Sequence, residues 1–202
     1  MTIDKILENQ RAYFQSGATL PVSFRITMLK KLLATVNKYE KEIGEALTAD
    51  LGKSDFEGFM CETGLVRSEI SYMIKHVRRY AKEKTVYTPI TQFASRSYKK
   101  PCPYGNVLIM SPWNYPFLLT MDPLADAIAA GNTVVVKPSA YSPATSAIIE
   151  MIITECFDPQ YVAVVTGGRK ENAALLEKNL TLFSSPDRKL WARKSCGTRQ
   201  KP

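Results

Sequence analysis

The segment 107-VLIMSPWNYPFLLTMDPLADAIAAGNTVVVKPS-139 has the clearest pattern of strands and helices in this chain. Its continuous apolar run Val107–Met110 favours a short buried strand, and Ser111–Pro116 is a loop pinned by two prolines. Phe117–Ala130 is predicted to be a helix that ends at Gly131, because glycine readily closes a helix C-terminus. Thr133–Val136 is then a second buried strand, so the segment predicts a strand–helix–strand unit.

The same pattern repeats downstream. Lys137–Ser142 is the next loop, and Pro143–Cys156 is the next helix, with Ser142 as its N-cap and proline at the first helical position. Val162–Val165 is a third strand, and the Gly167-Gly168 turn follows it. This β-α-β-α-β order implies a parallel sheet, in which ligands bind beyond the carboxyl ends of the strands.

The first half of the chain is predicted to be helical. From Pro21 to Gly52, with a break near Asn37, and again from Met60 to Tyr80, apolar residues recur at steps of three and four. Residues 85–100 are instead rich in Tyr, Thr and Ser and favour an edge hairpin. The expected fold class is α/β: N-terminal helices in 1–84, a hairpin-like segment in 85–100, part of a Rossmann-like dinucleotide-binding sheet in 101–179, and a tail in 180–202.

Composition restricts the class of protein. The chain has 202 residues, 45% hydrophobic and 23% charged, which is enough for a sizeable core, and it has no apolar run that could cross a bilayer. Residues 1–10 lack a signal-peptide pattern, so a cytoplasmic protein is expected. The four cysteines form no CxxC pair and His76 is the single histidine, so neither a metal site nor a disulfide framework is expected.

The net charge of +8 raises the question of a nucleic-acid partner. Six basic residues and one acid after Asn179 give the tail +5, so the rest of the chain, with 21 basic and 18 acidic residues, carries only +3. The tail has no periodicity and no groove-reading motif. No nucleic-acid partner is therefore expected; salt-sensitive DNA retention that disappears with the tail would indicate the opposite.

Three loops at the predicted strand ends carry candidate site residues. Pro112 and Pro116 stiffen the backbone around Asn114, whose amide could donate a hydrogen bond to a developing oxyanion; alternatively, Asn114 closes a turn and Trp113 is core. Lys137 follows a buried strand and points its ammonium toward the strand-end crevice, where the ribose or phosphates of a cofactor could lie; alternatively, it is simply solvated. The Gly167-Gly168 pair permits close approach of a ligand ring or makes a tight turn, and no GxGxxG fingerprint occurs.

Longer motifs connect these loops. They are Tyr104–Val107, Ile109–Pro116, Pro123-Leu124 and Ala129–Ser139, and upstream Ala46-Leu47, Asp50–Ser54 and Glu57. In order and spacing they closely resemble the aldehyde dehydrogenase superfamily, and the upstream motifs resemble its fatty-aldehyde, class 3 branch. The resemblance runs from about the first helix to Lys178.

The resemblance implies an activity. In this family a cysteine thiolate attacks an aldehyde, a hydride passes to NAD or NADP, and water activated by a glutamate releases the carboxylic acid. It implies that Asn114 is the oxyanion donor and that Ser111, Pro112 and Trp113 line the nicotinamide side of the cofactor site. Lys137 would bind the adenosine ribose and Gly167-Gly168 would lie beside the adenine. Intact relatives are expected to be homodimers, with the region of residues 85–100 serving oligomerisation.

Position 140 bears on the choice of cofactor. The family often has a glutamate three residues after the lysine, whereas this chain has Ala140. Without a carboxylate to repel the 2′-phosphate, both NAD and NADP should be tolerated.

The resemblance stops after Asn179. The Phe-Thr-Gly loop, the catalytic Glu and the Gly-Gln-x-Cys context of the nucleophile do not follow, and Cys196 lies in a basic segment without positioned substrate. Codons for 180–202 can be chosen so that the frame one base back encodes a strand, a Phe-Thr-Gly loop and a helix. We therefore expect a frameshifted, disordered tail and an inactive N-terminal portion; the alternative is a non-catalytic protein that pairs with a full-length relative.

Overall fold

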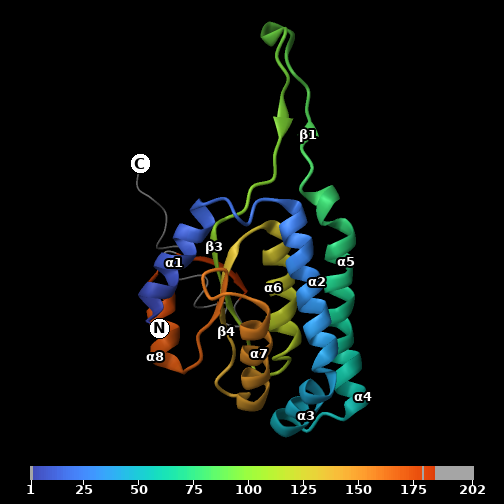
Figure 1. Cartoon of the computed structure of the whole chain (residues 1–202), viewed down its shortest axis with the longest axis vertical. Helices are drawn as coiled ribbons and strands as arrows, with labels where there is room; N and C mark the ends of the chain where they lie inside the picture. The colour runs from blue at the N-terminus through green and yellow to red at the C-terminus, as the bar shows by residue number, and fades with distance from the viewer. Residues whose placement is uncertain (1, 179, 185–202) are drawn as a thin grey trace.

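A parallel sheet forms the centre of the molecule. The computed structural model describes residues 2–178 and 180–184, and its four-stranded sheet has the order β5-β4-β3-β6 with every pair parallel (Figure 1). The strands are β3 (Asn106–Met110), β4 (Thr133–Lys137), β5 (Val162–Val164) and β6 (Thr181–Ser184). The predicted β-α-β-α-β unit and its parallel sheet are thus confirmed.

The strand β6 corrects the expected tail. The interpretation of residues 180–202 as an out-of-frame tail predicts disorder, yet Thr181–Ser184 pairs with β3, with Val107 opposite Thr181 and Leu108 opposite Leu182. The free edge of β3 offers unpaired backbone groups, and a short Thr-, Leu- and Phe-containing segment satisfies them. Residues 185–202, including Cys196, lie outside the described part of the chain.

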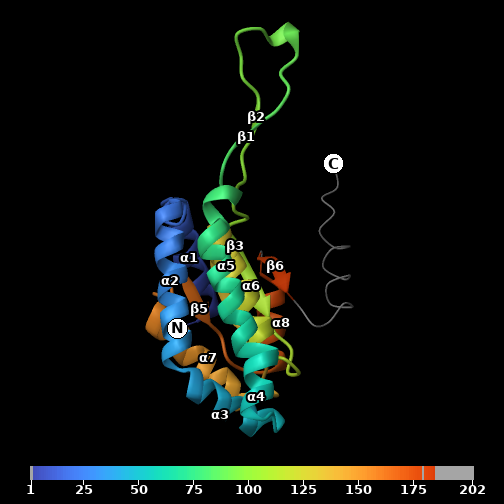
Figure 2. The same cartoon turned by 90° about the vertical axis from the view of Figure 1, so that its right-hand side faces the viewer.

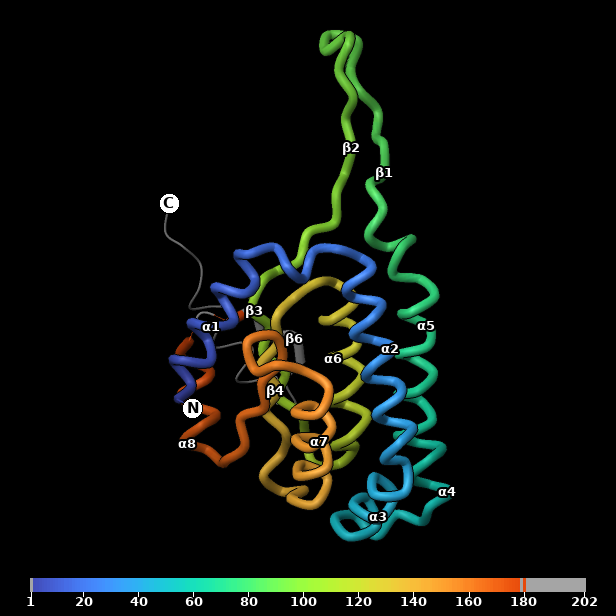
Figure 3. The backbone as a smooth tube through the Cα atoms, viewed as in Figure 1, coloured from blue at the N-terminus to red at the C-terminus, as the bar shows by residue number. Residues whose placement is uncertain are grey.

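Helices cover both faces of the sheet. On one face α1 (Ile3–Gln15) and α8 (Arg169–Leu176) enclose a small core around Leu108 and Val135. On the other face α6 (Leu118–Ala130) and α7 (Pro143–Cys156) pack on Val107 and Val134 and form the inner part of a larger core (Figure 3). Adjacent strand residues point to opposite faces, so the continuous apolar strands fill both cores.

A second helical layer lies outside α6 and α7. It consists of α2 (Val22–Lys38), α3 (Glu40–Leu51), α4 (Asp55–Gly58), the π-helix η1 (Phe59–Thr63) and α5 (Gly64–Tyr80). The predicted break near Asn37 falls at Tyr39. Met60 and Tyr80 lie on the predicted apolar stripe but are 53% and 44% exposed. The wider turn of η1 shifts the phase of the stripe, which turns Met60 outward.

The segment predicted as a hairpin is an arm that projects from the body (Figure 2). Its antiparallel strands are β1 (Lys84–Thr85) and β2 (Tyr98–Lys99), and its tip contains the 3-10 helix η2 (Ile90–Gln92). Tyr87, Ile90 and Phe93 are each more than four-fifths exposed. The arm therefore presents apolar side chains to solvent.

The N-terminus of α7 is capped from the helical layer. Ser142 occupies the N-cap position as predicted, but its side chain makes no capping hydrogen bond. The carboxylate of Asp50 instead accepts from the backbone N–H groups of Ala144, at 3.1 Å, and Thr145, at 2.7 Å. The expected capping role of the Ser142 hydroxyl is therefore wrong, because a carboxylate outcompetes it at the positive end of the helix. Within the described residues, no helix has the length and apolar character needed to cross a membrane.

Candidate functional site

Two of the candidate loops lie side by side at the carboxyl ends of β3 and β4. Met110 pairs with Lys137 in the parallel register, and the Ser111 N–H donates to the Lys137 carbonyl at 3.2 Å. The loops that begin at Ser111 and at Pro138 therefore leave the same edge of the sheet. The sequence predicted this position of the two loops correctly, because consecutive strands of a parallel unit end on the same side of the sheet.

The beginning of the first loop is fixed by hydroxyl groups. Ser111 is buried, and its hydroxyl lies 2.7 Å from that of Thr120 in the first turns of α6. The Thr120 hydroxyl donates to the Pro116 carbonyl at 2.5 Å. The loop is thus tied to the helix that follows it.

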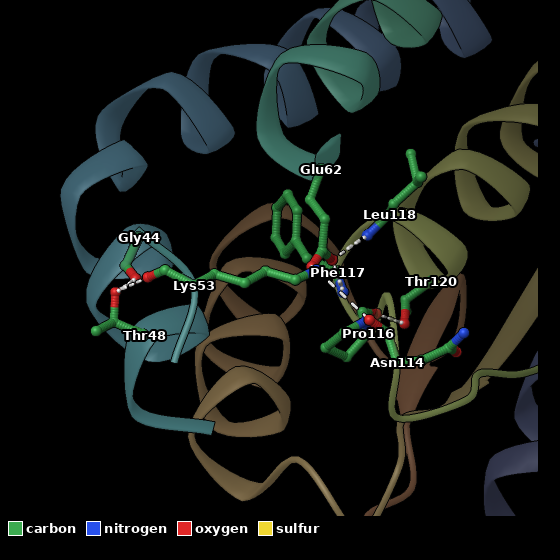
Figure 4. A network of polar contacts seen from close by, with 9 residues as sticks. All are labelled: Gly44, Thr48, Lys53, Glu62, Asn114, Pro116, Phe117, Leu118 and Thr120. Carbon is green, nitrogen blue, oxygen red and sulfur yellow. Dashed lines mark hydrogen bonds and ion pairs between the residues drawn. The ribbon is translucent and has the colours of Figure 1, made fainter. Parts of the chain in front are cut away.

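The middle of the loop contacts a buried ion pair that comes from the helical layer (Figure 4). Lys53 Nζ lies 2.5 Å from Glu62 Oε1, 3.4 Å from the carbonyl oxygen of Asn114 and 4.1 Å from the ring centroid of Tyr115. Lys53 follows α3 and Glu62 belongs to η1, so three separate segments meet here. A cation over an aromatic ring adds a favourable contact to the ion pair.

The Asn114 side chain is exposed, as is Trp113, which is 57% accessible. The alternative that Trp113 is core is therefore wrong. In Figure 4 the Asn114 amide points away from the ion pair, and the hydrogen bonds found among the described residues use only its backbone carbonyl. Its amide donors can therefore reach a ligand at this edge of the sheet.

A groove opens beside the second loop. It has a volume of about 310 Å³, and its lining comes from the Pro138–Ala140 loop, from α7 residues that include Glu150, and from Thr166 and Gly167. This volume lies at the lower end of the range for small-molecule sites. The β4–α7 and β5–α8 loops thus form one concave surface, as the strand-end argument predicts.

Lys137 immediately precedes the Pro138 loop that lines this groove, and its side chain is buried rather than in solvent. It is 3% exposed, and its ammonium donates to the Pro138 carbonyl at 2.8 Å. Burial lowers the pKa of this ammonium, while the Glu171 carboxylate acts in the opposite direction. An ammonium has three donors, so it can also bind a hydroxyl placed in the groove.

The Gly167-Gly168 turn begins α8. Gly167 has φ +131, and a Cβ there would come within 2.5 Å of the Glu171 carboxylate. That carboxylate accepts from the Gly168 N–H at 2.7 Å, and hydrogen bonds from the Glu171 and Gly168 backbone N–H groups lower its pKa. The turn therefore requires glycine at 167 so that Glu171 can cap α8.

Sequence reasoning missed the residues behind the Asn114 loop. Glu62 stands four residues before Val66 and eight before Ile70, so this acid lies in line with the apolar face of α5, and it is fully buried. An acid in such a stripe is a signal for a buried partner. Nothing local indicated that Lys53 would be that partner.

The chain belongs to the aldehyde dehydrogenase family, whose model matches residues 1–182. This family consists of oxidoreductases that act on aldehydes, and the match confirms the resemblance given by the strand-end motifs. The chain spans between 32% and 39% of the length of curated relatives that it matches.

Individual relatives agree with the family assignment. The chain is 41% identical over 174 residues to the 4,4'-diaponeurosporen-aldehyde dehydrogenase of Staphylococcus aureus, covering 86% of this chain and 38% of the relative. It is 40% identical over 177 residues to the dimeric NADP-preferring aldehyde dehydrogenase of Canis lupus familiaris, covering 87% and 39%. The substrate-bound Staphylococcus aureus AldH structure superposes with a TM-score of 0.85 at 40% identity, over 87% of this chain and 38% of that one.

Proposed function

We propose that this chain supplies the oxyanion and cofactor loops for the NAD(P)-dependent oxidation of an aldehyde to a carboxylic acid. The observation that supports this most is that the Asn114 loop and the Pro138 loop, which lines the groove, leave the sheet at the carboxyl ends of paired strands. The Asn114 amide donates to the oxygen of the aldehyde as negative charge develops on it. The cofactor, when bound, supplies the acceptor for the hydride.

The groove residues fit the adenosine part of such a cofactor. Lys137 donates to a ribose hydroxyl, and a Cβ added at Gly168 would meet nothing within 4 Å, so a flat ring can approach the backbone beside this turn. Ser111, Pro112 and Trp113 line the nicotinamide side. The nucleophile and the general base of the family are not among the residues that we assign, because no Gly-Gln-x-Cys segment occurs in these 202 residues.

Cofactor choice follows from the groove wall. Ala140 lines the groove and adds no charge to it, so a 2′-phosphate meets no carboxylate from this position, and the carboxylate in the groove lining is that of Glu150 on α7. One relative is named as NADP-preferring. We therefore propose that both NAD and NADP are accepted.

Nucleotide titration followed by NMR tests this proposal. Adding NAD or NADP to the 202-residue chain should shift the amide signals of Ser139 and Gly167, with dissociation constants in the millimolar range, equivalent to about 4 kcal/mol. The variant Ala140→Glu should weaken NADP binding by about tenfold and leave NAD binding within about twofold, because the new carboxylate repels only the 2′-phosphate.

The variant Ala173→Glu, on the exposed side of α8, is the matched control for added charge and should change neither affinity. Signals at the groove that do not move with either nucleotide would contradict the proposal. Binding of NAD without binding of NADP would contradict the dual preference alone.

A second candidate function is pairing with another copy or with a full-length relative. The arm between β1 and β2 carries exposed apolar residues at its tip, and such a surface is typical of a protein contact. We propose that this arm contributes to a dimer.

Sedimentation velocity checks the pairing. The chain should sediment as a dimer at about 50 µM, and the double variant Ile90→Ser/Phe93→Ser should shift it to the monomer, since it removes the apolar tip. The control Leu65→Ser replaces an apolar residue that is 47% exposed on α5 and should leave the dimer intact. A wild-type chain that remains monomeric at this concentration would refute this function.

A further inference from the structure

The loop that carries Asn114 rests on charged residues of the helical layer, outside the two strand-end loops. We propose that Lys53 and Glu62 are positioning residues, whose buried ion pair fixes the backbone of this loop and keeps the Asn114 amide available to a substrate oxygen. The inference rests on the oxyanion role proposed above for Asn114.

Burial of the pair is the first argument. Glu62 is 0% exposed and Lys53 is 8% exposed, and their charged atoms lie 2.5 Å apart. Among the described residues, every other ion pair has at least one side chain that is more than a third exposed. A buried pair depends on good geometry and on additional hydrogen bonds, and it contributes specificity of structure more readily than stability.

The remaining contacts of both charged groups are with this one loop. Glu62 Oε2 accepts from the N–H of Phe117 at 2.8 Å and from the N–H of Leu118 at 3.1 Å, at the end of the loop where α6 begins. Lys53 Nζ approaches the Asn114 carbonyl and the Tyr115 ring. The pair therefore holds the loop on both sides of Pro116, while the Thr120 hydroxyl holds Pro116 itself.

The local backbone explains how Glu62 reaches the loop. It belongs to the π-helix η1, where the chain between α4 and α5 contains an extra residue per turn. Such insertions are rare and occur often near functional sites, where they redirect a side chain. Here Glu62 points toward α6, and Figure 4 shows its carboxylate between Lys53 and the Phe117 and Leu118 amides.

The geometry gives Lys53 and Glu62 a role in supporting the loop and not in contacting a substrate. Lys53 and Glu62 touch the backbone and a neighbouring ring, whereas the Asn114 amide points away from them. Removing the pair should therefore leave the Asn114 amide group itself unchanged and make its position less ordered. A catalytic role for Lys53 or Glu62 is not part of the proposal.

The test compares loop order in three variants of the full 202-residue chain. Lys53→Met removes the cation at similar length, and Lys53→Met/Glu62→Gln removes both charges so that no unpaired buried charge remains. Lys38→Met is the matched control, because Lys38 also pairs with a glutamate, Glu155 at 2.8 Å, and lies 4.6 Å from the ring centroid of a tyrosine, but at the surface.

Two readouts follow the loop without needing activity. One is amide hydrogen exchange of Phe117 and Leu118, and the other is the NMR order parameter of the Asn114 side-chain NH₂, assigned by its loss in Asn114→Asp. In Lys53→Met and in the double variant we expect exchange at Phe117 and Leu118 to be at least about tenfold faster, the change expected when a charge-assisted contact is weakened. The Asn114 order parameter should fall below about 0.6.

Exchange in β4 separates positioning from general stability. The proposal expects Val134 and Val135 to exchange at the wild-type rate while the loop loosens, and it expects Lys38→Met to change neither. A loop that keeps its exchange rates in the double variant would overturn the proposal. Equal acceleration of the loop and of β4 would overturn it as well, because the pair would then serve stability alone. If Lys53→Met does not fold, the double variant decides by the same criteria.

Both measurements are made without a cofactor and without an aldehyde. A failure of the NAD and NADP titration would therefore contradict the proposed function without altering the exchange rates. Conversely, an unchanged loop in the double variant beside normal nucleotide binding would remove only the positioning role.

Discussion

Replacing Gly131 by alanine is expected to lower the free energy of unfolding by about 3–5 kcal/mol, the upper range of single substitutions. Gly131 ends α6 with φ +91, a left-handed conformation that costs a residue with a Cβ about 1–2 kcal/mol. In addition, the new Cβ would lie 2.7 Å from two atoms of the Arg25 guanidinium. The clash should account for more than half of the loss.

Arg25 has little freedom to move away. It is 8% exposed and donates to the carbonyls of Thr19, Leu20 and Ala129 at 3.0, 2.8 and 3.2 Å. These hydrogen bonds connect the loop before α2 with the end of α6. A displaced guanidinium would leave charged donors buried without acceptors, which costs more than the loss of a neutral hydrogen bond.

Thermal and urea unfolding followed by circular dichroism measure the effect, with a decrease in Tm of roughly 10 °C for a chain of this size. Gly52→Ala is the control, because Gly52 also has a positive φ, +66, but has nothing within 4 Å of an added Cβ. It should cost only about 1 kcal/mol. Similar losses in the two variants would show that Arg25 is not the obstacle. In an Arg25→Leu background the Gly131→Ala penalty should shrink toward that of Gly52→Ala.

The sequence was sufficient for the elements that local rules determine. Val107–Met110 and Thr133–Val136 are apolar runs bounded by glycine, proline or polar residues, and both are strands with ends shifted by at most one residue. Pro143 begins α7 and Gly131 ends α6 as predicted. The parallel order is then favoured, because a helix is the usual crossover connection between neighbouring parallel strands.

The contacts that the sequence did not predict join residues far apart along the chain. Asp50 caps α7 over a separation of 94 residues, and Glu62 caps α6 over 55. Neither contact follows from helix periodicity, because periodicity indicates which face of a helix is buried and not which residues pack against that face. Similarly, the frameshift interpretation predicted disorder after Asn179, whereas β6 pairs with the free edge of β3.

The second large effect is the dependence of stability on pH. Asp122 and Asp126 of α6 lie near Glu69 of α5, and each has one carboxylate oxygen that is buried without a hydrogen-bond partner. Burial, together with the charges of Glu69 and Asp126, raises the pKa of Asp122 to about 7. Burial, together with Glu69, raises the pKa of Asp126 to about 6.

The direction of the effect follows from proton binding. An Asp122 carboxyl that titrates near 7 when folded and near 3.8 when unfolded binds more protons in the folded state between these values. Its contribution to stability is therefore complete below about pH 4 and is lost as the pH rises through 7. At pH 8 the folded protein holds a partly buried carboxylate close to two others.

Asp122→Asn removes this charge and should stabilise the protein at pH 8 by about 1–2 kcal/mol. The rise of the Asp122 pKa from 3.8 to about 7 corresponds to about 4 kcal/mol, and we halve this because the side chain is only partly buried. Urea unfolding at pH 4 and at pH 8 measures the difference, and the advantage of the variant should disappear at pH 4. The exposed Glu150→Gln on α7 is the control and should give the same small change at both values.

Asp126→Asn should act in the same direction with a smaller effect, and the two substitutions should not add, because each carboxylate raises the cost of ionising the other. Stabilisation by Asp122→Asn that is as large at pH 4 as at pH 8 would mean that a change in packing, and not the charge, is responsible. A loss of stability at pH 8 would mean that the carboxylate has a favourable partner there, which is the opposite of what the raised pKa requires.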